Sequence, residues 1–358
     1  MIKMRKVILT TGGTGGHIYP AITLAKKLIE HDCEVLFVGT KHRMEKEIVP
    51  GENFNFIGLD ILSGKSIKSI YKMVVAIIDS LKILKKENPD AIIGFGNYIS
   101  VPMIVAGLLK RKKIYLHEQN VKMGFANNFF YHFSNKLFVS FEETFNNIPI
   151  KYQPKVIVTG NPIREDFYNV RKKQEREKLK LKQNEKMLLV VGGSLGAKSI
   201  NDAILSKWEK IFNEKNIRLY WATGKNNYSE ISKKITKIKQ EDVVKPYFEN
   251  IAELMAASDL LISRGGASTI SEIIQLLKPS IIIPYNYVGQ YDNARVLEEN
   301  GGTKIFEDKD AENAFDFMFN IINDDKKLEI MSSNMKKMKK GNAAERMLRE
   351  LDIWRNEK

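Results

Sequence analysis

Two glycine-rich turns carry the strongest chemical signal in this sequence. GGTGGH runs from Gly12 to His17 and GGSLGA from Gly192 to Ala197, and each follows a short apolar run. Glycine permits a tight turn and a close approach of backbone to ligand, and a helix beginning there offers unpaired N–H groups to an anion. Finding this arrangement twice predicts two Rossmann-like halves with a phosphorylated ligand between them.

A third polar segment, SRGGASTISE, runs from Ser263 to Glu272 after another apolar run. The hydroxyls of Ser268 and Thr269, with the N–H groups of a helix start, suit a diphosphate. Glu272 could accept hydrogen bonds from ribose hydroxyls, as an acidic residue does in dinucleotide sites. The alternative is that Ser268 caps the helix and Glu272 interacts with its dipole.

The elements that would position these residues alternate regularly along the chain. Amphipathic helices are predicted at Ile18 to Glu30 and Ser69 to Glu87. The predicted strands are Val7 to Thr11, Glu34 to Gly39, Ala91 to Gly94, Lys113 to His117, Lys136 to Val139, Leu188 to Val191, Arg218 to Ala222, Leu260 to Ser263 and Ser280 to Pro284. This pattern predicts an α/β fold with mostly parallel sheets. Ligands bind at the carboxyl ends of such strands, which the polar segments follow.

The length of 358 residues predicts two domains. We place the boundary at Asn161-Pro162, which gives an N-terminal domain over 1–162 and a C-terminal domain over 163–342. A C-terminal helix over 343–358 is expected to pack back on the first domain.

Composition narrows the partners. The net charge of +14 favours anionic partners, and nucleic acid ranks last because no RNA-binding motif appears. Glycines and Pro102 interrupt the uncharged run Ala91 to Leu109, so we expect a soluble chain without a signal peptide. The single cysteine fits a reducing compartment. The histidine spacing predicts no metal site, and Asp308-Lys309-Asp310 is expected in a solvated loop.

Together these segments resemble one enzyme family. The chain is similar to the lipid-intermediate transferases of peptidoglycan synthesis, which move N-acetylglucosamine from a UDP donor to undecaprenyl-pyrophosphoryl-N-acetylmuramyl-pentapeptide. The resemblance rests on GGTGGH with Ile18-Tyr19-Pro20, GNYIS, HEQN (His117 to Asn120), GNPIR (Gly160 to Arg164), GGSLGA, SRGGASTISE and the Gln290 to Ala294 segment. It implies a GT-B fold and an inverting, metal-independent transfer that forms a β-1,4 linkage with no cofactor. It covers about Val7 to Asn293.

For the UDP sugar, the resemblance implies a set drawn from both domains. Gln290 would bind sugar hydroxyls, and the backbone of Phe248 would meet the uracil. Gly289 departs from the family pattern, where some members carry a second glutamine. The full expected donor set is Thr14, Gly15, Gly16, Asn120, Arg164, Ser194, Phe248, Ala267, Ser268, Thr269, Ile270, Ser271, Glu272 and Gln290.

For the lipid acceptor and the chemistry, the resemblance points to the first domain. His17 would either take the proton from the attacking C4 hydroxyl or only position it, and Glu118 would orient a neighbour or be the base itself. Asn120 and Asn127 would share a helix face if that helix starts early. The expected acceptor set is Gly13, His17, Gly96, Asn97, Tyr98 and Asn127, and Asn97 stands where the family often has glycine.

The location of the acceptor implies a peripheral enzyme on the cytoplasmic face of the plasma membrane. Apolar residues over Ile70 to Lys86, flanked by lysines, could rest on an anionic leaflet or simply pack on their own sheet. Partners in cell-wall synthesis and division are conceivable. Three other functions stay open: a UDP-N-acetylglucosamine 2-epimerase, a non-catalytic nucleotide-sugar scaffold and, last, a nicotinamide dehydrogenase. A dehydrogenase ranks last because this sequence has no acidic residue directly after Glu34 to Gly39 to hold an adenosine ribose.

Overall fold

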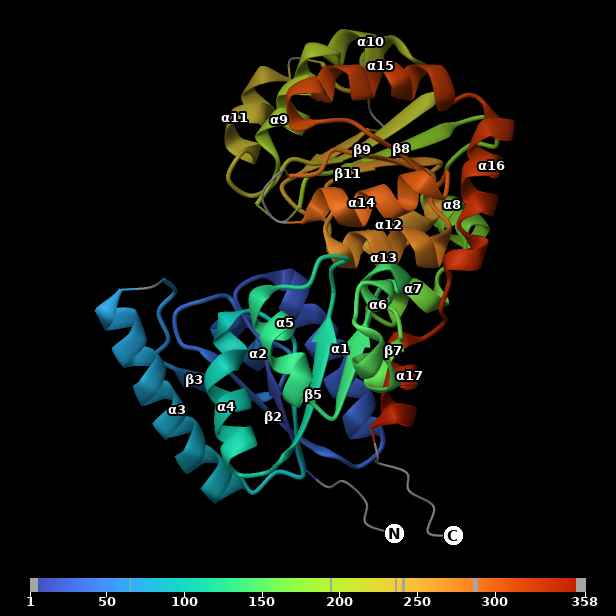
Figure 1. The fold of residues 1–358 in the computed structure, drawn as a ribbon. Coiled ribbons are helices and arrows are strands. Elements are labelled where there is room, and N and C mark those ends of the chain that lie inside the picture. The colour runs from blue at the N-terminus through green and yellow to red at the C-terminus, as the bar shows by residue number, and fades with distance from the viewer. Residues whose placement is uncertain are drawn as a thin grey trace. The chain divides into compact units, whose positions relative to one another are not determined.

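The chain crosses twice between two structural units (Figure 1). Unit 1 comprises Met1–Arg164 and Lys340–Lys358, and unit 2 comprises Glu165–Lys339. The computed structural model describes residues 6–64, 66–193, 195–235, 237–239, 242–285 and 289–351. Both units contain a parallel sheet covered by helices on its two faces, which is the predicted fold class.

Unit 1 contains a seven-stranded parallel sheet in the order β3-β2-β1-β4-β5-β6-β7. Its strands are β1 (Lys6–Thr10), β2 (Glu34–Thr40), β3 (Asn55–Leu59), β4 (Ala91–Gly94), β5 (Lys113–Glu118), β6 (Lys136–Val139) and β7 (Val156–Val158). Its helices are α1 (Gly15–Glu30), α2 (Glu45–Gly51), α3 (Ile67–Glu87), α4 (Val101–Leu109), α5 (Phe125–Phe130), α6 (Glu142–Asn146) and α17 (Ala343–Glu350), with 3-10 turns η1 (Tyr98–Ser100), η2 (Tyr131–Phe133) and η3 (Ile150–Lys155).

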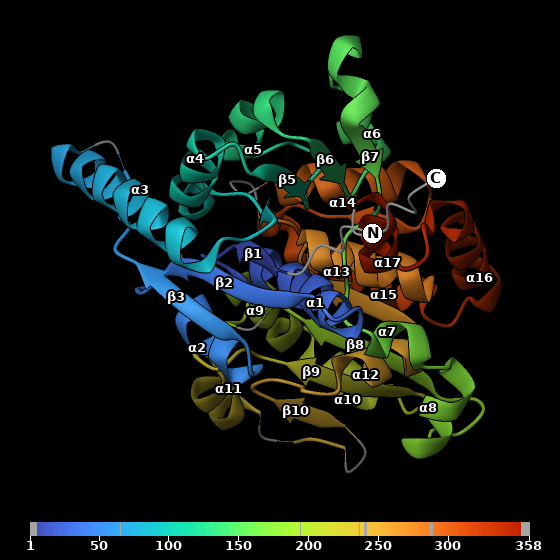
Figure 2. The ribbon, with the colours of Figure 1, turned by 90° about the horizontal axis from the view of Figure 1, so that it is seen from below.

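The alternation of side chains along β1 builds the two core layers of unit 1. Val7 and Leu9 pack in one layer with residues of α1 and α17, and Ile8 packs in the other with residues of α3 and α4. Figure 2 shows α17 beside α1, and Met347 and Leu348 of α17 are buried in that layer. The C-terminal helix therefore completes the core of the unit in which the chain begins.

Unit 2 contains a six-stranded parallel sheet in the order β10-β9-β8-β11-β12-β13. Its strands are β8 (Lys186–Val191), β9 (Ile217–Ala222), β10 (Val243–Lys245), β11 (Leu260–Ser263), β12 (Ser280–Ile282) and β13 (Thr303–Ile305). Its helices are α7 (Asp166–Asn169), α8 (Lys172–Lys178), α9 (Lys198–Ser206), α10 (Trp208–Asn213), α11 (Tyr228–Lys234), α12 (Ile251–Ala257), α13 (Ala267–Leu276), α14 (Gln290–Glu299), α15 (Ala311–Ile321) and α16 (Asp325–Asn334), with 3-10 turns η4 (Asp308–Asp310) and η5 (Lys336–Met338).

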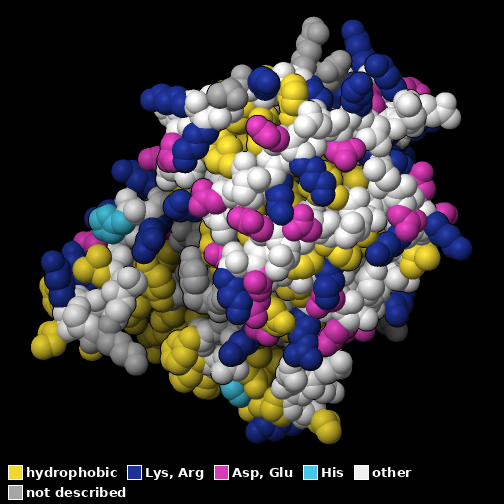
Figure 3. All heavy atoms as spheres, turned by 90° about the horizontal axis from the view of Figure 1, so that it is seen from above, with side chains coloured by type: hydrophobic (Ala, Val, Ile, Leu, Met, Phe, Trp, Pro, Cys, Tyr) yellow, Lys and Arg dark blue, Asp and Glu magenta, His cyan; other side chains and the backbone are white. Residues whose placement is uncertain are grey.

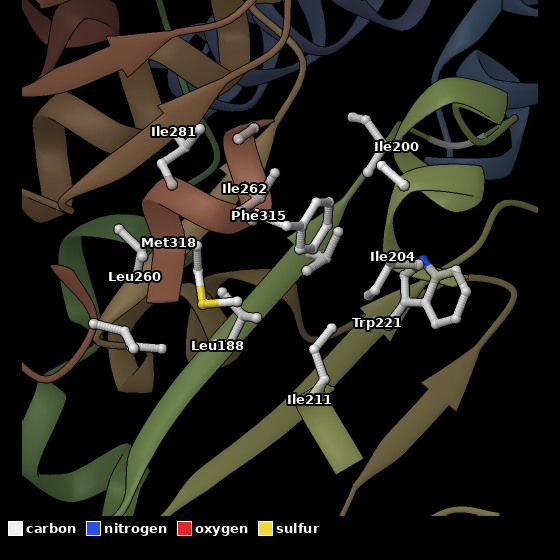
Figure 4. Packing of buried hydrophobic residues seen from close by; sticks show 14 of the residues in the cluster. Leu188, Ile200, Ile204, Ile211, Trp221, Leu260, Ile262, Ile281, Phe315 and Met318 are labelled. Atoms are coloured by element: carbon white, nitrogen blue, oxygen red, sulfur yellow. The ribbon is translucent and has the colours of Figure 1, made fainter. Parts of the chain in front are cut away.

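The core of unit 2 is built where α9 and α15 cover the sheet. Figure 4 shows Phe315 and Met318 of α15 directed at Leu188 of β8, with Trp221 of β9 packed beside Ile204 of α9. All five side chains are at most 1% exposed. This packing fixes the central strands β8 and β11, whose carboxyl ends carry the polar segments.

The four strands that the sequence pattern did not predict are the sheet edges β3, β7, β10 and β13. Edge strands are short and only partly covered by helices. Most residues of β3 are therefore half-buried, and in β13 buried and exposed residues alternate. All nine predicted strands are present, with ends shifted by at most a few residues. The predicted end at Pro284 is wrong, because β12 stops at Ile282.

Candidate active site

The polar segments of each unit flank the point where the strand order reverses. In unit 1 the order reverses between β1 and β4, and GGTGGH follows β1 while GFGNYIS follows β4. In unit 2 it reverses between β8 and β11, and these strands precede GGSLGA and SRGGASTISE. Open parallel sheets bind ligands at such switch points. Each unit therefore has a candidate binding edge of its own.

The first glycine turn is held by a buried carboxylate. Glu45 of α2 is completely buried and accepts hydrogen bonds from Gly13 N at 2.9 Å and Thr40 N at 3.0 Å. A Cβ atom on Gly12 would lie only 2.3 Å from the Glu45 carboxylate, so glycine is required there. The Gly13 N–H thus points at the protein's own anion. The N–H of Gly13, a member of the expected acceptor set, is therefore engaged with Glu45.

His17 lies in the first turn of α1, just after Thr14, Gly15 and Gly16. Its Nδ1 lies 3.0 Å from Thr14 Oγ1, and its carbonyl accepts a 2.8 Å hydrogen bond from Thr11 Oγ1. Burial lowers the pKa of His17 to about 4, so the imidazole is neutral at physiological pH. With Nδ1 directed at Thr14, Nε2 is the ring atom left to meet a substrate.

The β4 loop is tied to the first glycine turn by Asn97. Its side chain accepts a 2.8 Å hydrogen bond from Ile99 N and donates one to Gly12 O. The backbone of Asn97 has φ +54° and ψ 174°, a conformation outside the left-handed helical region that glycine adopts far more readily than other residues. The family's glycine suits this conformation, and the two side-chain hydrogen bonds hold asparagine in it. Tyr98 follows at the start of η1 and is half-buried.

Polar side chains from three segments converge at Gly96. A Cβ atom there would lie 3.2 Å from Asn127 Nδ2, 3.6 Å from His17 Cδ2 and 3.7 Å from Gln119 Oε1. Within the described residues, the buried oxygens Asn127 Oδ1 and Gln119 Oε1 have no hydrogen-bond partner. Buried acceptors are normally satisfied, so this corner is suited to a ligand that brings donors, such as a sugar.

Glu118 is turned into the protein, where it organises the HEQN loop. It accepts hydrogen bonds from Asn120 N at 3.0 Å, Gly124 N at 3.1 Å and Asn127 Nδ2 at 2.9 Å. Burial raises the pKa of Glu118, although these hydrogen bonds oppose the shift. The carboxylate is only 2% exposed. Both its oxygens are already engaged with the chain, which favours positioning over proton transfer.

Asn120 and Asn127 do not share a helix face, because α5 begins only at Phe125. The condition for a shared face, an early start of that helix, is therefore not met. The two amides instead meet through Glu118, to which Asn120 Nδ2 donates at 3.2 Å and Asn127 Nδ2 at 2.9 Å. A loop folded around one carboxylate brings them together, which helical periodicity could not predict.

His117 and Gln119 are functional candidates that the sequence analysis did not single out. Gln119 Nε2 lies 3.0 Å from His117 Nδ1, which places the imidazole proton on Nε2, 3.3 Å from Gly160 O. Burial lowers the pKa of His117 to about 4. The sequence feature that could have identified His117 and Gln119 is their position at the carboxyl end of a buried strand.

In unit 2 the helix α13 begins directly after the polar loop. Its N-cap is Gly266, which has no side chain to cap it, and no acidic residue lies in the first turn. The alternative of Ser268 as N-cap is therefore wrong. Ser268, Thr269 and Glu272 are half-buried. Among the other predicted donor residues, Ile270 is completely buried, Ala267 is nearly so, and the Ser271 hydroxyl donates to Ala267 O at 2.8 Å.

Arg264 holds the loop that precedes α13 in place through its buried side chain. It is 6% exposed, donates to Ile283 O at 2.8 Å and to Ser199 Oγ at 2.9 Å, and forms an ion pair with Asp308. Asp308 is thus part of the loop's support, which corrects its expected place in a solvated loop. Behind the loop, a Cβ atom on Gly265 would lie 2.6 Å from Gln290 O, so α13 and α14 approach closely there.

The remaining predicted donor residues are distributed over both units. Gln290 begins α14, and its Oε1 accepts a 3.1 Å hydrogen bond from Tyr285 N. Gly289 has φ +69°, which explains glycine at this departure from the family. Phe248 is buried with its ring 6.1 Å from that of Tyr220. Arg164 is half-buried at the end of the first stretch of unit 1, and Ser194 lies outside the described residues.

Among the residues that the structure describes, no group of three or more His, Cys, Asp or Glu side chains is arranged to hold a metal ion. Nor does any described helix have the length and hydropathy needed to cross a membrane.

Both halves of the chain match models of known protein families. The glycosyltransferase family 28 N-terminal domain matches residues 7–139, and the family 28 C-terminal domain matches residues 187–347. A curated protein of Fusobacterium nucleatum is 50% identical over 99% of this chain and 100% of its own length. One of Finegoldia magna is 35% identical over 96% and 97%. Both are named UDP-N-acetylglucosamine–N-acetylmuramyl-(pentapeptide) pyrophosphoryl-undecaprenol N-acetylglucosamine transferase.

Solved structures share the fold. The crystal structure of Acinetobacter baumannii MurG matches with a TM-score of 0.79 at 23% identity and covers 98% of this chain and 100% of that one. UDP-GlcNAc 2-epimerase from Neisseria meningitidis matches with a TM-score of 0.67 at 17% identity, over 97% and 99%. At these identities the likeness concerns architecture alone, and two enzyme classes have it in common.

Proposed function

The chain belongs to glycosyltransferase family 28, and we propose that it transfers N-acetylglucosamine from UDP-N-acetylglucosamine to the C4 hydroxyl of undecaprenyl-pyrophosphoryl-N-acetylmuramyl-pentapeptide. This reaction supplies the disaccharide lipid intermediate of peptidoglycan synthesis. The observation that carries the proposal is the 50% identity with the Fusobacterium protein over both full chains. Two sheets with polar switch points, one in each unit, suit a reaction of two substrates.

The donor belongs to unit 2 in this proposal. The diphosphate of UDP is bound by N–H groups at the start of α13 with Ser268 and Thr269, where the helix dipole favours negative charge. Glu272, one turn further, binds the ribose hydroxyls. Gln290 binds hydroxyls of the sugar, since its amide nitrogen donates while its oxygen is held by Tyr285 N. Stabilisation of the leaving diphosphate at α13 removes the need for an acid.

The acceptor belongs to unit 1 in this proposal. Its muramyl sugar brings hydroxyl and amide donors to Asn127 Oδ1 and Gln119 Oε1, the two unsatisfied oxygens beside Gly96. Its C4 oxygen attacks the anomeric carbon, the bond from that carbon to the diphosphate oxygen breaks, and the hydroxyl proton passes to Nε2 of neutral His17. Glu118 is a positioning residue that holds Asn120 and Asn127. We propose that these steps use no metal or other cofactor.

A membrane surface is the proposed site of docking, on the cytoplasmic face. The apolar residues of α3 form two sets. The inner set, which includes Leu84 and Met73, packs on the core of unit 1. The other set faces outward. We define the outer face of α3 as Ile67, Ile70, Tyr71, Val74 and Ile78, each at least 48% exposed. Figure 3 shows hydrophobic side chains with lysines and arginines beside them at the left of the view, where α3 lies in Figure 1. Such a face suits an anionic leaflet.

The docking proposal is tested with vesicles. In co-sedimentation with phosphatidylglycerol vesicles, Val74→Ser with Ile78→Ser is expected to weaken binding about tenfold, because both apolar side chains lose their contact with lipid. The control pair, Ile238→Ser with Ile330→Ser, removes equally exposed apolar groups from unit 2 and should leave binding unchanged. Equal binding by the first pair and the wild type would remove the docking surface.

The activity is tested with labelled donor and a synthetic short-chain lipid acceptor. We expect label in the lipid product only when acceptor is present, with an unchanged donor sugar when it is absent. Conversion of the donor to an epimer without acceptor would identify an epimerase instead. Glu272→Ala is expected to raise the donor KM about tenfold with little change in kcat, because a hydrogen bond to the carboxylate is lost. An unchanged donor KM would remove the ribose assignment.

A further inference from the structure

Unit 2 contains a cavity that lies away from its switch point. The cavity has a volume of about 540 Å³. Asp259 and Pro279, which line it, directly precede β11 and β12, so it opens at the amino edge of the sheet. The polar segment Ser263 to Glu272 begins at the opposite, carboxyl end of β11. The cavity is therefore not part of the candidate donor site.

Both segments that connect the units contribute to this cavity. The chain enters unit 2 at Glu165 and leaves it at Lys339. Phe167 and Arg171, shortly after the entry, line the cavity, and so does Lys339 itself. Figure 1 shows α8 and α16 on the same side of unit 2, and residues of both helices also line it. A ligand held here would touch the entering and the leaving segment together.

The side chains around the cavity leave positive charge uncompensated. Its lining includes Arg171, Lys172, Lys278 and Lys339. Of the lining carboxylates, Asp259 is already paired, with Lys172 Nζ and Arg176 Nη1 each at 2.7 Å. Asp325 forms an ion pair with Lys186, which does not line the cavity. The third lining carboxylate is Glu329. Three lining cations, Arg171, Lys278 and Lys339, thus face one lining carboxylate outside these ion pairs, Glu329, although Asp259 also attracts Lys278.

The pKa values of two lining lysines are lowered in these surroundings. Burial lowers the pKa of Lys278 to about 7, and repulsion from Lys172 and Arg176 contributes to the shift. Partial desolvation lowers the pKa of Lys339, although its side chain is exposed, and repulsion from Arg171 adds to the shift. Lys278 Nζ donates to Ala256 O and Ser258 O, which uses two of the three N–H donors of an ammonium. An anion in the cavity would relieve the repulsion and accept the third hydrogen.

We propose that this cavity binds a small molecule carrying two or more clustered negative charges, held by Arg171, Lys278 and Lys339. Phosphate oxygens and carboxylates share the chemistry that these cations recognise. The volume of about 540 Å³ accommodates a molecule larger than a single phosphate ion. The planar guanidinium of Arg171 suits a bidentate contact with such a group.

The test is calorimetric titration of the full chain with pyrophosphate and, separately, with citrate, in the presence of saturating UDP to occupy the donor site. We expect saturable binding of at least one of them; which one binds distinguishes phosphate from carboxylate chemistry. Arg171→Gln with Lys339→Gln is expected to weaken this binding at least about tenfold, because two charge-assisted contacts are lost. Both side chains are exposed, so the substitutions should not affect folding.

The matched control is Lys336→Gln with Lys337→Gln, which removes the same charge from exposed positions outside the lining. It should change the affinity less than about twofold, since neither residue lines the cavity and exposed charges are screened by salt. Absence of saturable binding by both anions would overturn the proposal. So would an equal loss of affinity in the control. Neither result depends on transferase activity, so failure here is distinguishable from failure of the proposed function.

Discussion

Replacing Glu45 with glutamine tests how the first glycine turn is held. The carboxylate is fully buried and accepts hydrogen bonds from Gly13 N and Thr40 N. Glutamine has nearly the same shape but only one acceptor oxygen, so its NH₂ group must face one of these N–H donors. A hydrogen bond to a charged group contributes about 1.5–3 kcal/mol, and a buried donor left unsatisfied costs about 1–3 kcal/mol.

We therefore expect Glu45→Gln to lower the free energy of unfolding by about 3 kcal/mol, offset in part by the smaller cost of burying a neutral side chain. Displacement of the turn also moves His17, whose α1 begins two residues after Gly13. A shift of about 1 Å at a reacting group can lower the rate about 100-fold, so kcat should fall while the affinity for UDP in unit 2 stays unchanged.

Urea unfolding and labelled-sugar transfer measure the two effects. Glu47→Gln is the matched control, because Glu47 is on the same helix but exposed; it should change stability by no more than about 0.5 kcal/mol. If Glu45→Gln were as stable and as active as Glu47→Gln, the buried carboxylate would not support the turn.

Three further predictions concern the same sites. Because burial lowers the pKa of His17 to about 4, the pH profile of kcat/KM should be flat down to about pH 5.5, and a fall centred at 6.5 would contradict the neutral imidazole. The pKa of His117 is about 4 when folded and about 6.5 when unfolded, so the unfolded chain binds the extra proton between these values and stability is lost as pH falls through that window. The advantage of wild type over His117→Gln in unfolding free energy should thus shrink by about 3 kcal/mol from pH 6.5 to 4, and a pH-independent difference would refute it. Gly265→Ala places a Cβ atom 2.6 Å from Gln290 O, so we expect about 1–3 kcal/mol of destabilisation with weaker UDP binding, whereas wild-type values for both would show that the loop can shift freely.

The sequence predicted the parts of the fold that depend on continuous burial. Central strands such as β1 and β11 are built on buried apolar runs, Val7 to Leu9 and Leu260 to Ile262, and their carboxyl ends carry the motifs. The glycine turns were predictable because backbone requirements restrict the residue type: Gly13, for example, has φ +88°. Once the strands of each sheet were predicted to be parallel, the polar segments that follow them were expected at the same edge of that sheet.

Contacts between distant segments were not predictable in the same way. Glu45 lies 32 residues beyond Gly13, in a helix whose other acidic residue, Glu47, is exposed. Nothing in the local pattern separates the two. Likewise, Asn120 and Asn127 meet through a loop around Glu118, and periodicity assumes a regular helix. Periodicity over α3 indicated one apolar stripe, whereas the helix has an inner and an outer apolar face.

The most direct test of the central claim is a crystal structure of the protein with UDP. We predict the diphosphate against the first turn of α13, with its oxygens at Ser268 and Thr269 and the ribose hydroxyls at Glu272. UDP bound at any other edge of unit 2, or in unit 1, would contradict the assignment of donor and acceptor on which the proposed reaction rests.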